Sequence, residues 1–177
     1  MKTHAVKATL TAVAVVMGAA SVHAQNATPF QIVEATIDDI HMAMRAGKLT
    51  ARQLVQGYLD RINAYDKQGP TINSIITLNP NALAEADRLD AAFRTSGLVG
   101  PLHGVTILVK DEIDTAGMPT TLGTVVFKDY RPPKDAFVID KLRKAGAIIL
   151  GKATLSEFAA NAAPEPPDEP PTVRSRS

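Results

Sequence analysis

The stretch GPLHGVTILVKDEID, residues 100–114, decides the fold of this chain. It contains a short apolar run, residues 105–109, that follows a glycine and is rich in β-branched side chains. Such a run predicts a strand that is buried on both faces. The run ends at Lys110, and burial without a counter-ion lowers the pKa of a lysine toward neutrality. The alternative is an amine that extends into water, which is the commoner outcome for a lysine at a strand end.

Helix and strand signals surround this stretch. Thr36 can cap a helix that ends near Gly47, and Thr50 with Gln53 forms a capping-box pattern for a second helix. Asn79 and Pro80 are a typical start for a third helix, which is expected to end near Gly97. Further strands are expected at residues 72–78, 125–128 and 147–150, and further helices after Asp135 and from residue 154.

The two apolar strands at 105–110 and 147–150 have one helix between them. This order is typical of a parallel crossover, in which the helix packs on the sheet that contains both strands. The sequence therefore predicts an α/β fold, with N-terminal helices followed by part of a mixed or parallel sheet.

Residues 1–24 have the pattern of a secretory signal peptide. Lys2 and Lys7 precede an apolar segment, residues 8–20, and small residues precede an expected cleavage site after Ala24. A membrane anchor is the alternative, but the segment is shorter than the roughly 20 apolar residues that span a bilayer. We therefore expect a secreted or periplasmic protein that has no membrane association after cleavage.

Composition narrows the classes of partner and cofactor. The 177 residues contain 19 basic and 18 acidic side chains, and this balance gives no field that would attract nucleic acid. There is no cysteine, and the four histidines are scattered without metal-ligand spacing. We expect neither a metal nor a cofactor.

Several segments together carry a resemblance to a known family. They are GPLHGVTILVKDEIDTAGMPTT (residues 100–121), Gly123, Asp135 with Ala136, and LRKAGAIILGKATLSEFA (residues 142–159). Residues 30–161 resemble the N-terminal part of the amidase signature hydrolases. The resemblance implies hydrolysis of a small amide or peptide-terminal amide by a serine–serine–lysine triad. Lys110 would be the base that deprotonates a bridging serine, and this serine would activate the nucleophilic serine.

The C-terminal end departs from the family pattern. In the family both serines lie in a glycine- and serine-rich segment, whereas this sequence continues as PEPPDEPPTVRSRS from Pro164. We expect residues 25–161 to be an incomplete amidase domain and residues 162–177 to be a disordered tail from truncation or a frameshift. Ser156 is not placed beside a base and is not expected to replace the nucleophile. The chain alone is therefore expected to be inactive.

Two other functions stay open. The first is the glutamine-hydrolysing subunit of an amidotransferase, which belongs to the same family. The predicted signal peptide argues against this function, because the charged-tRNA substrate of that subunit is cytoplasmic. The second alternative is a non-catalytic binding module with a proline-rich tail, in which Pro167 and Pro170 have the bare spacing of a proline-rich ligand. The sequence determines neither the substrate nor the oligomeric state.

Overall fold

The computed structural model describes residues 30–160. The predicted signal peptide and the predicted tail from residue 162 lie outside the described residues. The helices are α1 (Ile37–Arg45), α2 (Ala51–Arg61), α3 (Ala82–Ser96) and α4 (Phe137–Lys144), and the strands are β1 (Ile75–Leu78), β2 (Thr106–Lys110) and β3 (Ile148–Ala153). A π-helical turn, Ile62–Lys67, extends α2, and 3-10 turns lie at Val125–Phe127 and Glu157–Ala159.

The first two helices begin at the predicted caps. The Thr36 hydroxyl accepts from the Asp39 amide, and the Thr50 hydroxyl accepts from the Gln53 amide, in a full capping box at each site. These bonds satisfy backbone donors that the first turn of a helix leaves without partners.

The third helix begins two residues later than the sequence predicted. Asn79 is buried and does not cap α3, because its side-chain amide donates to the carbonyl oxygen of Ile149 at 2.8 Å. Its own side-chain oxygen accepts from the backbone amide of Asn81 at 2.9 Å. Asn79 thus connects the end of β1 to β3. The helix ends at Gly97, whose φ of 78° lies in the region that favours glycine.

The three strands form a mixed sheet in the order β1-β3-β2. Strand β2 is parallel to β3, and α4 lies between them in the sequence, so the predicted crossover is confirmed. Strand β1 is antiparallel to β3. In the β2–β3 register, Ile107 pairs with Ile149 and Leu108 pairs with Gly151, so β3 has one additional residue at this point.

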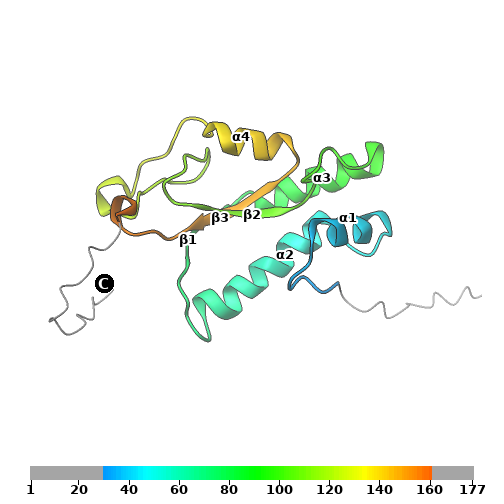
Figure 1. Cartoon of the computed structure of the whole chain (residues 1–177), viewed down its shortest axis with the longest axis horizontal. Coiled ribbons are helices and arrows are strands. Elements are labelled where there is room, and N and C mark those ends of the chain that lie inside the picture. Colours follow the sequence, from blue (N-terminus) through cyan, green and yellow to red (C-terminus); the bar gives the residue numbers. More distant parts are fainter. Residues whose placement is uncertain (1–29, 161–177) are drawn as a thin grey trace, which may run out of the picture.

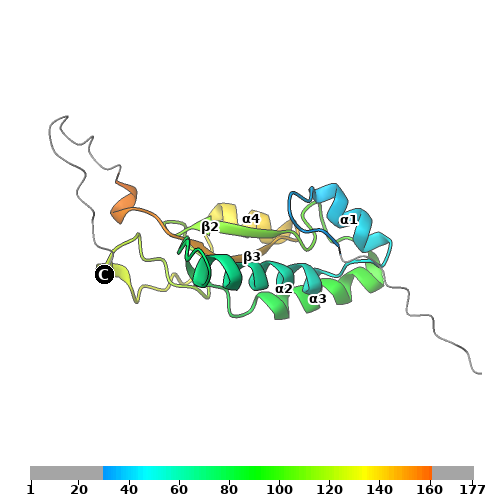
Figure 2. The same ribbon diagram turned by 90° about the horizontal axis from the view of Figure 1, so that it is seen from below.

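Helices cover both faces of the sheet (Figures 1 and 2). Helix α4 packs on one face through Ile139, in a cluster with Val109, Met118 and Ile149. Helices α2 and α3 lie on the other side, as Figure 2 shows. The larger cluster there joins α1, α2, α3 and β3, and it contains Ile40, Met44, Leu49, Ala51, Leu54, Val55, Ala82, Ala86, Ile148 and Leu150.

Strand β2 is not buried on both faces, which corrects the prediction for residues 105–109. Val109 is buried, but Leu108 on the opposite face is 44% exposed. The reason is that β2 is an edge strand of the described sheet, and its second face opens on a groove. The groove has a volume of about 550 Å³ and runs between the end of α2 and the sheet. It is lined by Tyr58, Arg61, Ile62, Tyr65, Asp66, Ile72, Ser74, Ile75, Thr106, Ile107, Leu108 and Leu150.

Three other local predictions were wrong. The predicted strand at residues 125–128 is wrong: Val125–Phe127 form a 3-10 turn with exposed valines. Residues 154–160, the last that the structure describes, contain a short 3-10 turn and no α-helix. Helix α4 has Ala136 at its cap position, because the Asp135 carboxylate instead accepts from the backbone amide of Ala116 at 2.7 Å. Among residues 30–160, no helix has the length and apolar character needed to span a membrane.

Candidate active site

Lys110, the predicted base, is the last residue of β2. Its side chain is exposed, and its Nζ donates to the carbonyl oxygen of Thr154 at 2.5 Å. Strand residues alternate between faces, so Lys110 lies on the same face as Thr106 and Leu108, which line the groove. The amine thus lies at the open face of the sheet and is held to the residue that follows β3. Of the two outcomes that the sequence left open, the exposed one describes Lys110 in this part of the chain.

The buried lysine of this fold is Lys152, in β3, which the sequence analysis did not single out. Its side chain is fully buried. Its Nζ donates to the Ile113 carbonyl oxygen at 2.8 Å, to the Thr120 hydroxyl at 2.9 Å and to the Pro119 carbonyl oxygen at 3.4 Å. Burial lowers the pKa of Lys152, and the nearby Asp111 carboxylate opposes that shift.

Asp111 is the counter-ion of Lys152. Its carboxylate is fully buried, and its Oδ1 lies 3.5 Å from Lys152 Nζ. Its Oδ2 accepts from the Thr121 backbone amide at 3.1 Å and from the Thr121 hydroxyl. A buried charge of either sign would be costly alone, but these two lie together and are hydrogen-bonded to the same loop.

The strand register explains why the two lysines differ. Val109 pairs with Lys152, and partners in a parallel pair point to the same face. Lys152 therefore shares the covered face with Val109, while Lys110 lies on the opposite face. Lys152 also follows an apolar run, residues 147–150, with only Gly151 between them, and this similar signal in the sequence could have identified it.

The described serines do not supply a partner for either lysine. Ser156 is exposed, and its hydroxyl donates to the Ala160 carbonyl oxygen at 2.7 Å. The Ser74 hydroxyl donates to the buried Asp66 carboxylate at 2.7 Å. Within residues 30–160, no serine hydroxyl is hydrogen-bonded to Lys110 or Lys152. Ser156 is therefore not placed as a nucleophile, as the sequence indicated.

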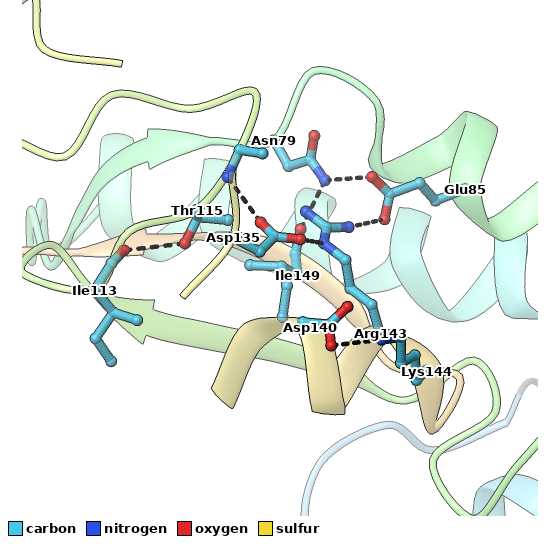
Figure 3. A network of polar contacts seen from close by, with 10 residues as sticks. Asn79, Glu85, Ile113, Thr115, Asp135, Asp140, Arg143, Lys144 and Ile149 are labelled. Atoms are coloured by element: carbon cyan, nitrogen blue, oxygen red, sulfur yellow. Dashed lines mark hydrogen bonds and ion pairs between the residues drawn. The ribbon is translucent and has the colours of Figure 1, made fainter. Parts of the chain in front are cut away.

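A second polar network fastens the loop after β2 to the helices (Figure 3). Arg143 of α4 contacts Glu85 of α3 at 2.9 Å and Asp135 at 3.0 Å. Asp135 in turn accepts from the Ala116 backbone amide, and Glu85 accepts from the Asn79 side chain at 3.1 Å. The loop that encloses Lys152 is thereby connected to both helices. No group of three or more histidine, aspartate and glutamate side chains in this part of the chain is arranged to hold a metal ion.

Comparison with known proteins assigns this arrangement to a family. The amidase family model matches residues 53–175, a range that continues past residue 161 into the predicted tail. Peptide amidase from Stenotrophomonas maltophilia is similar in structure, with a TM-score of 0.70 and 44% sequence identity over 73% of this chain. An amidase family protein from Bacillus anthracis has a TM-score of 0.68 and 41% identity over 71% of the chain. A glutamyl-tRNA(Gln) amidotransferase subunit from Halorhodospira halophila is 42% identical over 125 residues, which are 70% of the chain.

The chain therefore belongs to the amidase signature family. It spans about a quarter of the length of these relatives: 26% of the peptide amidase and 25% of the other two. The mixed three-stranded sheet with its helices corresponds to part of the family fold, as the sequence predicted.

Proposed function

We propose that the protein to which this sequence belongs hydrolyses the C–N bond of linear carboxamides, with peptide-terminal amides as the substrate class and Lys110 as the general base. The observation that carries this proposal is the match to a peptide amidase, at 44% identity and a TM-score of 0.70. The amidase family model also matches residues 53–175, a range that includes β2, the loop after it and the crossover to β3.

The chemistry assigns one step to this part of the chain. The Lys110 amine accepts a proton from the bridging serine, which in turn takes the proton of the nucleophilic serine, and the oxygen of this second serine attacks the amide carbonyl carbon. When the C–N bond breaks, the proton returns through the same relay to the departing amine, and water then releases the acyl group as a carboxylate. The serines of this relay are not assigned to any of the 177 residues. We therefore propose that the chain alone supplies the base and does not hydrolyse amides.

An exchange of segments tests the base assignment. Residues 30–160 replace the matching segment of the Stenotrophomonas maltophilia peptide amidase, and ammonia release from a peptide amide is measured. We expect an active chimera in which Lys110→Met lowers kcat/KM by at least about 100-fold, since a positioned general base contributes roughly 10²–10⁴-fold. The matched control is Lys48→Met, which removes an exposed lysine with no polar side-chain contact within residues 30–160. An active chimera that retains its rate after Lys110→Met would remove the base assignment.

The second candidate is the glutamine-hydrolysing component of an amidotransferase, which the 42% identity to the Halorhodospira halophila protein supports. We propose instead that residues 1–24 direct export, with cleavage after Ala24. Export would argue against the amidotransferase, because the substrate of that component is charged tRNA in the cytoplasm. Fractionation of a bacterial host and the N-terminal sequence of the product decide between the two. An uncleaved product in the cytoplasm favours the amidotransferase, and a mature N-terminus at Gln25 favours the exported amidase.

A further inference from the structure

We propose that Asp111 and Lys152 are positioning residues for Lys110, which hold its backbone and its hydrogen-bond acceptor in place from the opposite face of the sheet. This inference rests on the proposed function, in which Lys110 is the base. It goes beyond that function because it assigns a role to a buried ion pair that does not contact the reacting groups.

The first support is the position of Asp111, which directly follows Lys110. The Asp111 backbone amide donates to the Ala153 carbonyl oxygen at 3.1 Å, and Ala153 is the register partner of Lys110. Its side chain is anchored by Thr121 and paired with Lys152. The residue after the base is therefore fixed through both its backbone and its carboxylate.

The second support is the position of Lys152, two residues before Thr154. The Thr154 carbonyl oxygen is the acceptor of the Lys110 amine. The Lys152 ammonium is enclosed by oxygen atoms of Ile113, Pro119 and Thr120, all in the loop that follows β2. A displacement of Lys152 would move both this loop and the end of β3 that carries the acceptor.

The geometry also excludes Lys152 as the base. Its side chain has no exposed surface and its Nζ has three hydrogen-bond acceptors and a carboxylate around it. It lies on the face that α4 covers, while Lys110 lies on the face with the groove. A serine hydroxyl can approach Lys110 and cannot approach Lys152.

The test measures the Lys110 amine in the full 177-residue chain, without catalysis. Trace acetylation and mass spectrometry give the rate at each lysine relative to exposed Lys48, and lysine Nζ NMR reports the hydrogen bond of Lys110 Nζ to Thr154. In Lys152→Met we expect the acetylation rate of Lys110 to rise about fivefold. The reason is that weakening the single hydrogen bond from Lys110 Nζ to Thr154 shifts the equilibrium between the bonded and the free amine by about that factor. The neutral double variant Asp111→Asn/Lys152→Met is expected to be more stable than Lys152→Met, since neither charge is then left buried alone, but to keep the raised Lys110 rate, because the bonds from Lys152 to the loop are still absent.

A milder pair of variants keeps the test decisive if Lys152→Met does not fold. Thr121→Val removes the hydroxyl that donates to Asp111 and keeps the side-chain shape, while Thr121→Ser keeps the hydroxyl. We expect faster Lys110 acetylation and a weakened Nζ signal in Thr121→Val, with recovery in Thr121→Ser. Unchanged Lys110 rates in folded Lys152→Met or in Thr121→Val would overturn the positioning role. Because this readout needs no activity, the expected labelling together with an active chimera that retains its rate after Lys110→Met would refute only the base assignment.

Discussion

Arg143 and Lys144 offer a test of how burial changes the strength of an ion pair, because they are neighbours on α4 and each contacts a carboxylate (Figure 3). The Arg143 side chain is 25% exposed, and its partners Glu85 and Asp135 are 13% and 18% exposed. Lys144 pairs with Asp140 one turn away, and those side chains are 71% and 44% exposed. Replacing each cation with methionine keeps a side chain of similar length and removes the charge.

The structure gives different magnitudes for the two variants. A hydrogen bond to a charged group contributes about 1.5–3 kcal/mol, and Arg143 makes one to Glu85 in addition to its ion pair with Asp135. Residual exposure and the other donors, Asn79 to Glu85 and Ala116 to Asp135, reduce the loss. We expect Arg143→Met to lower the free energy of unfolding by about 3 kcal/mol. An exposed pair four residues apart on a helix contributes only about 0.3–0.5 kcal/mol, so Lys144→Met should cost no more than that.

Urea unfolding followed by circular dichroism at 222 nm measures both losses in the same chain. Arg143→Lys should fall between the native chain and Arg143→Met, because an ammonium group does not reproduce the planar fork that contacts two carboxylates. If Arg143→Met and Lys144→Met destabilise the chain equally, the network does not fasten α4 to α3 and the reasoning is wrong.

Three further predictions concern the pH dependence of stability. Burial lowers the pKa of Lys152 from 10.5, so as the pH rises the folded chain loses the Lys152 proton before the unfolded chain does. The free energy of unfolding should therefore rise with pH from the lowered pKa up to 10.5. Urea titrations at several pH values should show no such rise in Lys152→Met. Desolvation raises the pKa of Asp66, but hydrogen bonds from Ser74 and other donors outweigh it and lower the pKa from 3.8 to about 2. The stability from Asp66 is therefore complete above pH 3.8 and lost as the pH falls through 2; a melting-temperature profile of Asp66→Asn that matches the native one would contradict this. Burial lowers the pKa of His103 below 6.5, so stability should decrease as the pH falls below 6.5, and His103→Gln should reduce this decrease in the same assay.

The helix starts at Thr36 and Thr50 could be predicted because a capping box depends on residues three apart in the sequence. The parallel crossover could be predicted for a related reason. Two short apolar runs with one helix between them leave few topologies that bury both strands. In each case the deciding interaction lies within the segment or between consecutive elements.

The predictions that were wrong depend on contacts between distant segments. Asn79 caps no helix because its amide bonds to Ile149, 70 residues away. Asp135 caps no helix because its carboxylate bonds to Ala116 and Arg143. Residues 125–128 have the β-branched composition of a strand, but in the described sheet they have no neighbouring strand. A local preference for a cap or a strand does not decide the structure when a side chain bonds to a distant residue instead, or when a segment has no neighbouring strand to pair with.

The two lysines show the same limit at the candidate site. Lys110 and Lys152 each follow an apolar run, so composition alone does not say which one is buried. The register decides it, because Lys152 shares the covered face with Val109 and lies beside Asp111, whereas Lys110 lies on the open face. A general base must reach the hydroxyl group that it deprotonates. A fully buried ammonium instead needs a counter-ion beside it, and the side chains that bury it block the approach of any other group. These requirements conflict for one residue, and in residues 30–160 the fold separates them onto opposite faces of the sheet.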